Sequence, residues 1–174
     1  IVRFDDVCGA TNMDDLRAMT KIAQSKGCVV WWAVSPLYTT ESEPGRVYPQ
    51  LWNALSDHRV FFRVNQVHIP PPEPGVKMCS HGIVHVDHRL LTLEQQELSI
   101  RASCALLGTA VFVPPFNKYN SHTAQACADA AVVLGRFEDG WRNMKYTTMG
   151  SCSTADLYLH SRDWTPGEFE AWFQ

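Results

Sequence analysis

The chain begins with Ile1-Val2-Arg3-Phe4-Asp5-Asp6-Val7, an apolar segment that meets two adjacent carboxylates. We expect a first strand over residues 1–4 and a helix over residues 14–25, with Thr11 or Asn12 as its N-cap and Gly27 as its stop. The apolar run Cys28-Val29-Val30-Trp31-Trp32-Ala33-Val34 is typical of a strand buried on both faces. A strand, a helix and a buried strand in succession predict a parallel α/β fold.

The rest of the chain continues this alternation of elements. Helices are expected over residues 48–55, 92–107 and 121–130 and from residue 165, and strands over residues 60–64, 77–79, 110–113, 131–134 and 157–159. Thr92 and Gln95 have the spacing of a capping box, and Gly108 is the expected stop of that helix. The four prolines within residues 70–75 predict a loop. No repeat or linker interrupts the pattern, so we expect a single domain over residues 1–174, built as a right-handed open sheet or barrel.

The composition of the chain limits the kinds of partner that it is expected to bind. The chain has 174 residues, of which 45% are hydrophobic, and this is enough for a substantial core. Its formal net charge is -3 and its pI is about 6.2, so it lacks the basic field that attracts nucleic acid. No apolar run approaches the roughly 18 residues that a membrane span needs. We therefore expect neither nucleic acid nor a membrane span, and the sequence does not predict the oligomeric state.

The cysteines bear on the cellular compartment. All six are singly spaced, with no CxxC pair that would mark a structural zinc site. Several lie in apolar runs, where a free cysteine behaves as a small hydrophobic residue. This favours a reduced cytoplasmic protein. A secreted protein is the alternative if a leader was removed, because the chain starts with Ile1 and not with Met.

Candidate site residues follow several of the predicted strands. Asp5 and Asp6 follow the first strand, Ser80-His81-Gly82-Ile83-Val84-His85 follows residues 77–79, and His160 follows residues 157–159. Because the carboxyl ends of parallel strands meet at one edge of a sheet, these segments are expected to share a pocket.

Two imidazoles and one carboxylate are a sufficient ligand set for a catalytic divalent ion that keeps one position open for water. The spacing of His81 and His85 places them on one face if the segment forms a helical turn, and Gly82 allows a tight bend around an ion. Taken singly, an Asp-Asp pair is usually a turn and a histidine pair is often a surface feature. Their joint occurrence with His160, in this order, favours a functional site.

In these motifs the sequence resembles the polysaccharide deacetylase, or NodB-homology, family of metal-dependent carbohydrate esterases. Phe4-Asp5-Asp6 resembles the first family motif, which implies Asp5 as general base and Asp6 as metal ligand. His81 and His85 resemble the second motif, HxxxH, which supplies the other two ligands. Residues 157–160 resemble the fifth motif, which implies His160 as general acid.

The third family motif, commonly F-R-P-P-Y-G, is similar to Phe112-Val113-Pro114-Pro115-Phe116-Asn117. By this resemblance Pro115, Phe116 and Asn117 would contact the substrate, and a backbone N–H near Phe116 would help to stabilise the tetrahedral oxygen. The family has an arginine that contacts the base where this chain has Val113, so Arg3, Arg89 and Arg162 are candidate substitutes. Trp141 is a candidate for the fourth motif.

The resemblance implies an α/β fold, a distorted (β/α) barrel of about seven strands. It also implies hydrolysis of an N-acetyl group on a sugar within a glycan or its precursor, in a bacterial surface-polysaccharide setting. The implied cofactor is a divalent metal ion, zinc first, with cobalt, nickel or iron as alternatives. Three other readings stay open: a silent carbohydrate-binding or scaffold protein, an amide or ester hydrolase acting on a non-sugar substrate, and a structural α/β domain whose histidines never converge.

Overall fold

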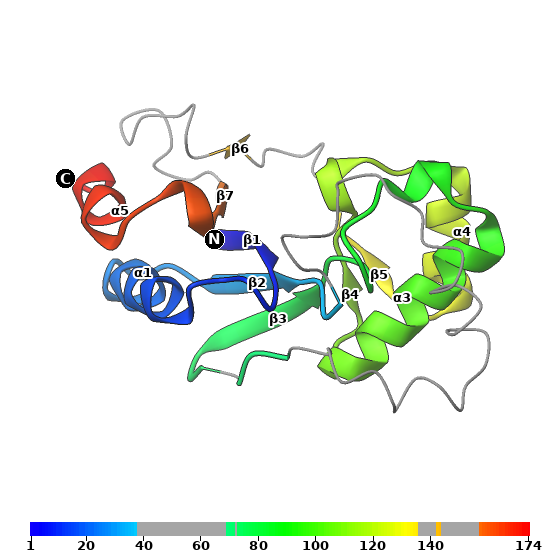
Figure 1. The fold of residues 1–174 in the computed structure, drawn as a ribbon, viewed down its shortest axis with the longest axis horizontal. Coiled ribbons are helices and arrows are strands. Elements are labelled where there is room, and N and C mark those ends of the chain that lie inside the picture. Colours follow the sequence, from blue (N-terminus) through cyan, green and yellow to red (C-terminus); the bar gives the residue numbers. More distant parts are fainter. Residues whose placement is uncertain (38–68, 72, 136–141, 144–156) are drawn as a thin grey trace.

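The computed structural model describes residues 1–37, 69–71, 73–135, 142–143 and 157–174. Within these ranges seven strands form one parallel sheet with the order β5-β4-β3-β2-β1-β7-β6 (Figure 1). The strands are β1 (Val2–Val7), β2 (Val30–Val34), β3 (Val76–Ser80), β4 (Val111–Phe112), β5 (Val133–Leu134), β6 (Arg142–Asn143) and β7 (Leu157–His160). The α-helices are α1 (Met13–Ser25), α3 (Leu93–Leu107), α4 (Ser121–Asp129) and α5 (Pro166–Trp172). The predicted α/β fold is confirmed.

Local signals in the sequence set the helix boundaries. The Asn12 side chain caps α1 by accepting hydrogen bonds from two backbone N–H groups of the first turn. Thr92 and Gln95 form the predicted capping box of α3, and Gly108 ends that helix in the left-handed conformation at φ 60°. Each cap satisfies backbone groups that have no partner inside the helix.

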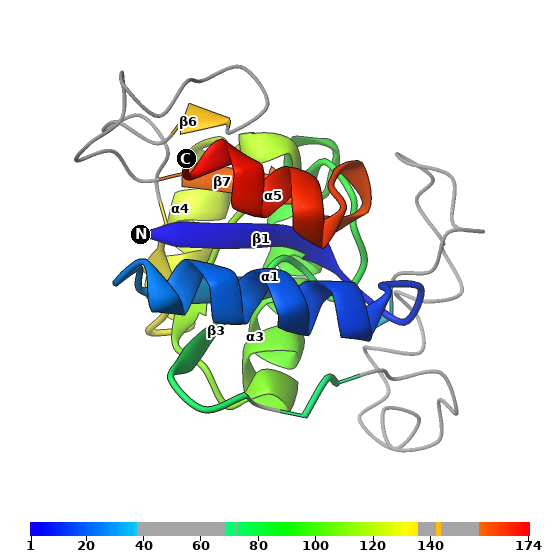
Figure 2. The same cartoon turned by 90° about the vertical axis from the view of Figure 1, so that its left-hand side faces the viewer.

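One face of the sheet packs against all four α-helices. Phe4 of β1 contacts Phe169 of α5, with ring centroids 5.6 Å apart, and the Trp32 indole N–H donates to Thr20 of α1. On the same face, Ser80 hydrogen-bonds Ser103 of α3 and Phe112 packs between α3 and α4. Figure 2 shows α1 and α5 in front of β1, with α3 and α4 behind the strands. Because one face meets helices on both sides of the molecule, the sheet is curved, as in a (β/α) barrel.

The structure corrects one expectation from the sequence, decides the conformation of one segment and leaves three expected features undescribed. The first strand does not stop at Phe4 but runs through both carboxylates to Val7. Residues 81–82 have no regular secondary structure and residues 83–85 form bends, so the segment is not a helical turn; Gly82 adopts φ 84° two residues after the end of β3. The helix expected over 48–55, the strand expected over 60–64 and Trp141 lie outside the described residues.

A membrane-spanning helix was not expected. In the ranges that the structure covers, every helix is too short or too polar to cross a bilayer.

Candidate metal centre

The site begins with an irregularity in β1. Its pairing with β2 is regular up to Phe4 and resumes, with a shifted register, at Val7. Between them Asp6 adopts φ 57°, a left-handed conformation that is uncommon for a residue with a side chain. Such a bulge changes the direction of a side chain, and strained backbone of this kind gathers at functional sites. Both Asp5 and Asp6 are almost fully buried at this edge of the sheet.

Asp6 meets the two predicted histidine ligands. Its Oδ1 atom lies 3.3 Å from Nε2 of His81 and 2.9 Å from Nε2 of His85. One potential ligand atom from each residue lies within 4.8 Å of those of the other two, and all three residues are buried. Within the described part of the chain, Asp6 Oδ1 accepts no hydrogen bond of good geometry despite these short distances. A buried carboxylate oxygen without a hydrogen bond, gathered with two imidazole nitrogens, is the arrangement that a cation would complete.

Neighbouring groups hold the imidazoles in this orientation. His81 Nδ1 lies 2.8 Å from the backbone oxygen of Val113, and since a carbonyl can only accept, Nδ1 carries the hydrogen. Nε2 of His81 is then left with the lone pair that a metal needs. The Phe116 ring packs edge-on against His85, with ring centroids 4.4 Å apart.

The electrostatics of the three residues also suit a cation. Burial opposes ionisation of Asp6, but His81 and His85 outweigh it and hold the pKa of the Asp6 carboxyl well below its usual range. Burial lowers the pKa of His85, although Asp6 beside it acts in the opposite direction. A carboxylate ligand must be ionised and an imidazole ligand neutral, which are the forms that these shifts favour for Asp6 and His85.

His160 lies beside this cluster at the end of β7. In the parallel register of β1 and β7, Asp5 is directly opposite His160. The His160 Nε2 atom is 3.6 Å from Asp6 Oδ2, and its Nδ1 atom is 3.4 Å from the carboxylate of Asp163. Arg162 places an Nη2 atom 2.9 Å from the same Asp6 oxygen. The two oxygens of Asp6 therefore face different groups: Oδ1 faces the imidazole pair, and Oδ2 faces His160 and Arg162.

Asp5 is paired with Arg3, two residues earlier on the same strand. The Nε and Nη2 atoms of Arg3 donate to the two carboxylate oxygens of Asp5 at 2.5 and 2.6 Å. Both side chains are only 3% exposed. Of the three arginines considered as substitutes for the family arginine, Arg3 is therefore the one in contact with Asp5. Arg89 pairs instead with Asp87.

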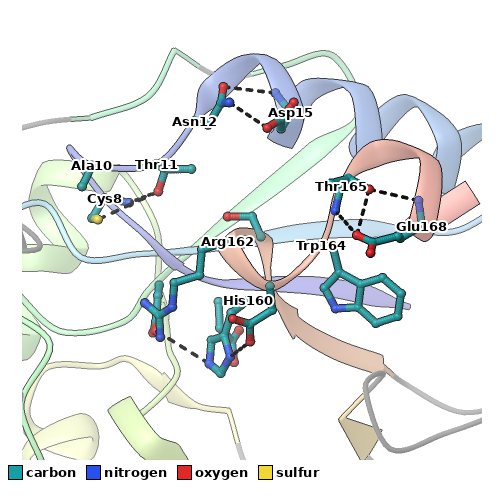
Figure 3. Close-up of a pocket in the computed structure, with 14 residues that line it drawn as sticks. Cys8, Ala10, Thr11, Asn12, Asp15, His160, Arg162, Trp164, Thr165 and Glu168 are labelled. Carbon is teal, nitrogen blue, oxygen red and sulfur yellow. Dashed lines mark hydrogen bonds and ion pairs between the residues drawn. The ribbon is translucent and has the colours of Figure 1, made fainter.

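A cavity of about 400 Å³ opens onto Asp5, Asp6 and His160. Figure 3 shows the residues that line it, which come from the loop after β1, the loop after β7 and the starts of α1 and α5, the last two forming one wall. Asn12 and Glu168, the latter bonded to its capping partner Thr165, line that wall. A cavity of this size and polarity can admit a small polar substrate to the cluster.

The three predicted substrate-binding residues lie on the loop after β4. Pro115 is buried, whereas Phe116 is 41% exposed and adopts φ 58°. The side-chain oxygen of Asn117 is buried and has no hydrogen-bond partner among the described residues. Phe116 is thus the member of this group that offers surface beside the imidazole pair.

Behind the imidazoles a buried polar network supports their loop. His88 is fully buried, with Nδ1 3.0 Å from the Val86 oxygen and Nε2 3.1 Å from the Ser99 hydroxyl. The Ser99 hydroxyl also accepts from the backbone N–H of Ile83. A Cβ added at Gly82 would lie 2.8 Å from a ring carbon of His88, so the loop packs directly on this ring. His88 therefore supports the structure of this loop.

Sequence reasoning missed two of these partners. Asp163 follows His160 by three residues, a spacing that would have identified it as a possible orienting group. The bond from His81 to the backbone of Val113 had no signal, because any residue supplies a carbonyl oxygen.

The comparisons with known proteins bear on the fold. The sequence matches no protein-family model, and no curated protein is detectably similar to it. Among solved structures it is similar to a family 4 carbohydrate esterase from Streptomyces lividans in complex with acetate. The TM-score is 0.60 at 12% identity, over 99% of this chain and 82% of that one.

Two further solved structures have the same fold. The peptidoglycan deacetylase PdaC from Bacillus subtilis, a D285S mutant, matches with a TM-score of 0.57 at 12% identity, over 99% of this chain and 78% of that one. A family 4 pseudoenzyme from Bacillus anthracis matches with a TM-score of 0.58 at 10% identity, over 98% of this chain and 58% of that one. The chain therefore has the fold of the family 4 carbohydrate esterases, the NodB-like fold that the sequence motifs implied, with a possible metal site at the carboxyl edge of its sheet.

Proposed function

We propose that this chain is a divalent-metal-dependent hydrolase that removes an N-acetyl group from a sugar within a glycan or its precursor. One observation carries the proposal: Asp6, His81 and His85 converge in a buried cluster, with Asp5 and His160 at its side and a cavity leading to them. The similarity in fold to a carbohydrate esterase and to a peptidoglycan deacetylase supports it.

The ion would be held by Asp6, His81 and His85. Zinc is the first candidate, because one carboxylate and two imidazoles are ligands that it prefers. When bound, such an ion lowers the pKa of a water molecule and polarises a carbonyl group.

Asp5 would act as the general base. It is held as an ion pair with Arg3, and each of its oxygens keeps a second lone pair that can accept a proton from water. The cavity reaches this carboxylate, so a substrate can approach it.

His160 would act as the general acid. Its Nε2 atom faces the cluster, and Asp163 lies on the Nδ1 side, as expected for an imidazole that is held in one orientation. A proton from His160 to the amide nitrogen would let the C–N bond break, with acetate and a free amine as products.

The proposal is tested by measuring acetate release from N-acetylglucosamine oligomers after chelation and after zinc is added back. Activity should require the metal and should fall at least about 100-fold in Asp5→Asn, since a positioned general base contributes about 10² to 10⁴ in rate. His122→Ala is a matched control, because His122 is exposed on α4. Full activity in Asp5→Asn would remove the assigned base.

Two rival functions are separated by the same assay. A non-sugar amide hydrolase would release acetate faster from N-acetylated amines than from the oligomers. A silent glycan-binding protein is a rival because one protein of this fold is a pseudoenzyme and because Val113 replaces the motif arginine. It would bind the oligomers without turnover, and His160→Ala would leave their affinity unchanged.

A further inference from the structure

The pairing of Arg3 with Asp5 is more specific than a surface ion pair. Arg3 is 3% exposed and Asp5 is 2% exposed. Two buried charges lose much hydration energy, and such a pair persists only where its geometry is good. Here the guanidinium contacts both carboxylate oxygens through two nitrogen atoms. This two-point contact fixes the rotation of the carboxylate as well as its position.

The strands on either side hold Arg3 in place. In register, Arg3 lies between Trp31 of β2 and Tyr158 of β7. The centre of its guanidinium is 5.7 Å from the centroid of the Tyr158 ring. Alternate residues of a strand lie on the same face, so Arg3 and Asp5 both belong to the face of β1 opposite the helices. The arginine thus supports the carboxylate from within its own strand.

Val113, on the loop after β4, has no charged side chain that could support Asp5. Val113 is 3% exposed and packs against Ala33 and Cys79. Arg162 also approaches the cluster, but its partner is Asp6.

We propose that Arg3 is a positioning residue that holds Asp5 as the general base, and this inference rests on the proposed function. It extends that function to a residue outside the motifs that suggested it. The role requires the fork of a guanidinium and not merely a positive charge, because a lysine ammonium cannot contact both oxygens with the same rigidity.

The test is a double-mutant cycle with acetate release from N-acetylglucosamine oligomers as the readout, using the zinc-loaded protein. Arg3→Met should lower kcat about 100-fold and Arg3→Lys at least about tenfold, with KM and zinc affinity within about twofold of wild type. In the Asp5→Asn background, Arg3→Met should lower kcat less than about threefold, because the carboxylate that Arg3 positions is already absent. If Arg3 had a merely structural role, Arg3→Met would lower kcat by the same factor in the wild-type and Asp5→Asn backgrounds.

Lys77→Met is the matched control. Lys77 is a cation on the same face of the sheet and lies over Trp31 at 5.4 Å, and its loss should leave kcat unchanged. If Arg3→Met does not fold, Arg3→Lys carries the test in both backgrounds. Wild-type kcat in the Arg3 variants, or equal losses in the two backgrounds, would overturn the inference.

Failure of the proposed function gives a separate result. If the zinc-loaded wild-type protein releases no acetate from any acetylated sugar or amine, the proposed deacetylase function is wrong. Crystal structures of the wild type and Arg3→Lys then decide the positioning role without any activity. A change in the side-chain rotamer of Asp5 supports the role, and an unmoved Asp5 contradicts it.

Discussion

The Nδ1 atom of His81 is bonded to the backbone oxygen of Val113 at 2.8 Å, which links the end of β3 to the loop after β4. The family motif has an arginine at this point, but the contribution of position 113 here is its carbonyl group. That contribution is independent of the side chain. A chain without the motif arginine can therefore keep the orientation of His81, the histidine that we propose as a metal ligand.

The first prediction concerns metal affinity. Removal of one ligand, in Asp6→Asn or His81→Ala, should weaken zinc binding at least about 100-fold, because loss of even an outer partner of a ligand costs 10- to 100-fold. Competition with a chromogenic chelator measures the change, with His122→Ala as control. Zinc affinity equal to that of the wild type in both variants would place the ion elsewhere.

The second prediction separates the role proposed for His160, as general acid, from that of the proposed metal ligands. His160→Ala should lower kcat on an N-acetylated sugar about 10²- to 10⁴-fold. It should lower the hydrolysis of 4-nitrophenyl acetate less than about tenfold, because a nitrophenolate leaves without being protonated. Zinc affinity should stay close to wild type. Equal losses on both substrates would argue against a proton-donating role for His160.

The third prediction concerns the bend after β3. Gly82→Ala should destabilise the protein by about 1 to 3 kcal/mol, since an added Cβ meets His88 and the Val84 oxygen at 2.8 Å and Gly82 has φ 84°. Thermal or urea unfolding measures the change, and zinc affinity should fall with it. The control is Gly167→Ala in α5, where no atom lies within 4 Å and a neutral or slightly stabilising effect is expected. Similar stabilities for the two variants would contradict the packing described for this loop.

The fourth prediction concerns the pH dependence of stability. Burial lowers the pKa of His88 from 6.5 to about 4, so the folded protein favours its neutral form. Its contribution to stability is then fully present above pH 6.5 and is lost as the pH falls toward 4. The loss is about 2 kcal/mol at pH 5 and about 3 kcal/mol in full.

Urea unfolding of the metal-free protein at pH 7.5 and pH 5 measures this loss. His88→Gln cannot titrate, so its stability should fall less than that of the wild type over the same interval. An equal fall in both proteins would show that His88 does not contribute to the pH dependence.

Much of the fold was predictable because its signals are local. The caps of α1 and α3 and the buried strands are visible in the sequence, and the structure confirms them. The left-handed Asp6 was not predictable, because a bulge depends on pairing with the neighbouring strand and not on the residue itself. The spacing of His81 and His85 left open whether a helical turn or a bend at Gly82 brings them together. In the structure Gly82, with φ 84°, bends the chain after β3.

The candidate site, too, was predictable only in part. The residue types and their order predicted which side chains would meet, and the structure brings Asp6, His81 and His85 together. Sequence left three arginines as possible partners of Asp5, because pairing depends on which face of a strand each side chain occupies. The contact with Arg3 follows from the two-residue repeat of β1, once that strand is known to extend through Asp5.

The proposed metal centre is tested most directly by anomalous diffraction from a zinc-soaked crystal, recorded at the zinc absorption edge. We expect one ion within about 2.0 to 2.2 Å of a carboxylate oxygen of Asp6 and the Nε2 atoms of His81 and His85, with Asp5 and His160 beside it. An anomalous peak at other residues, or none at this cluster under saturating zinc, would contradict it.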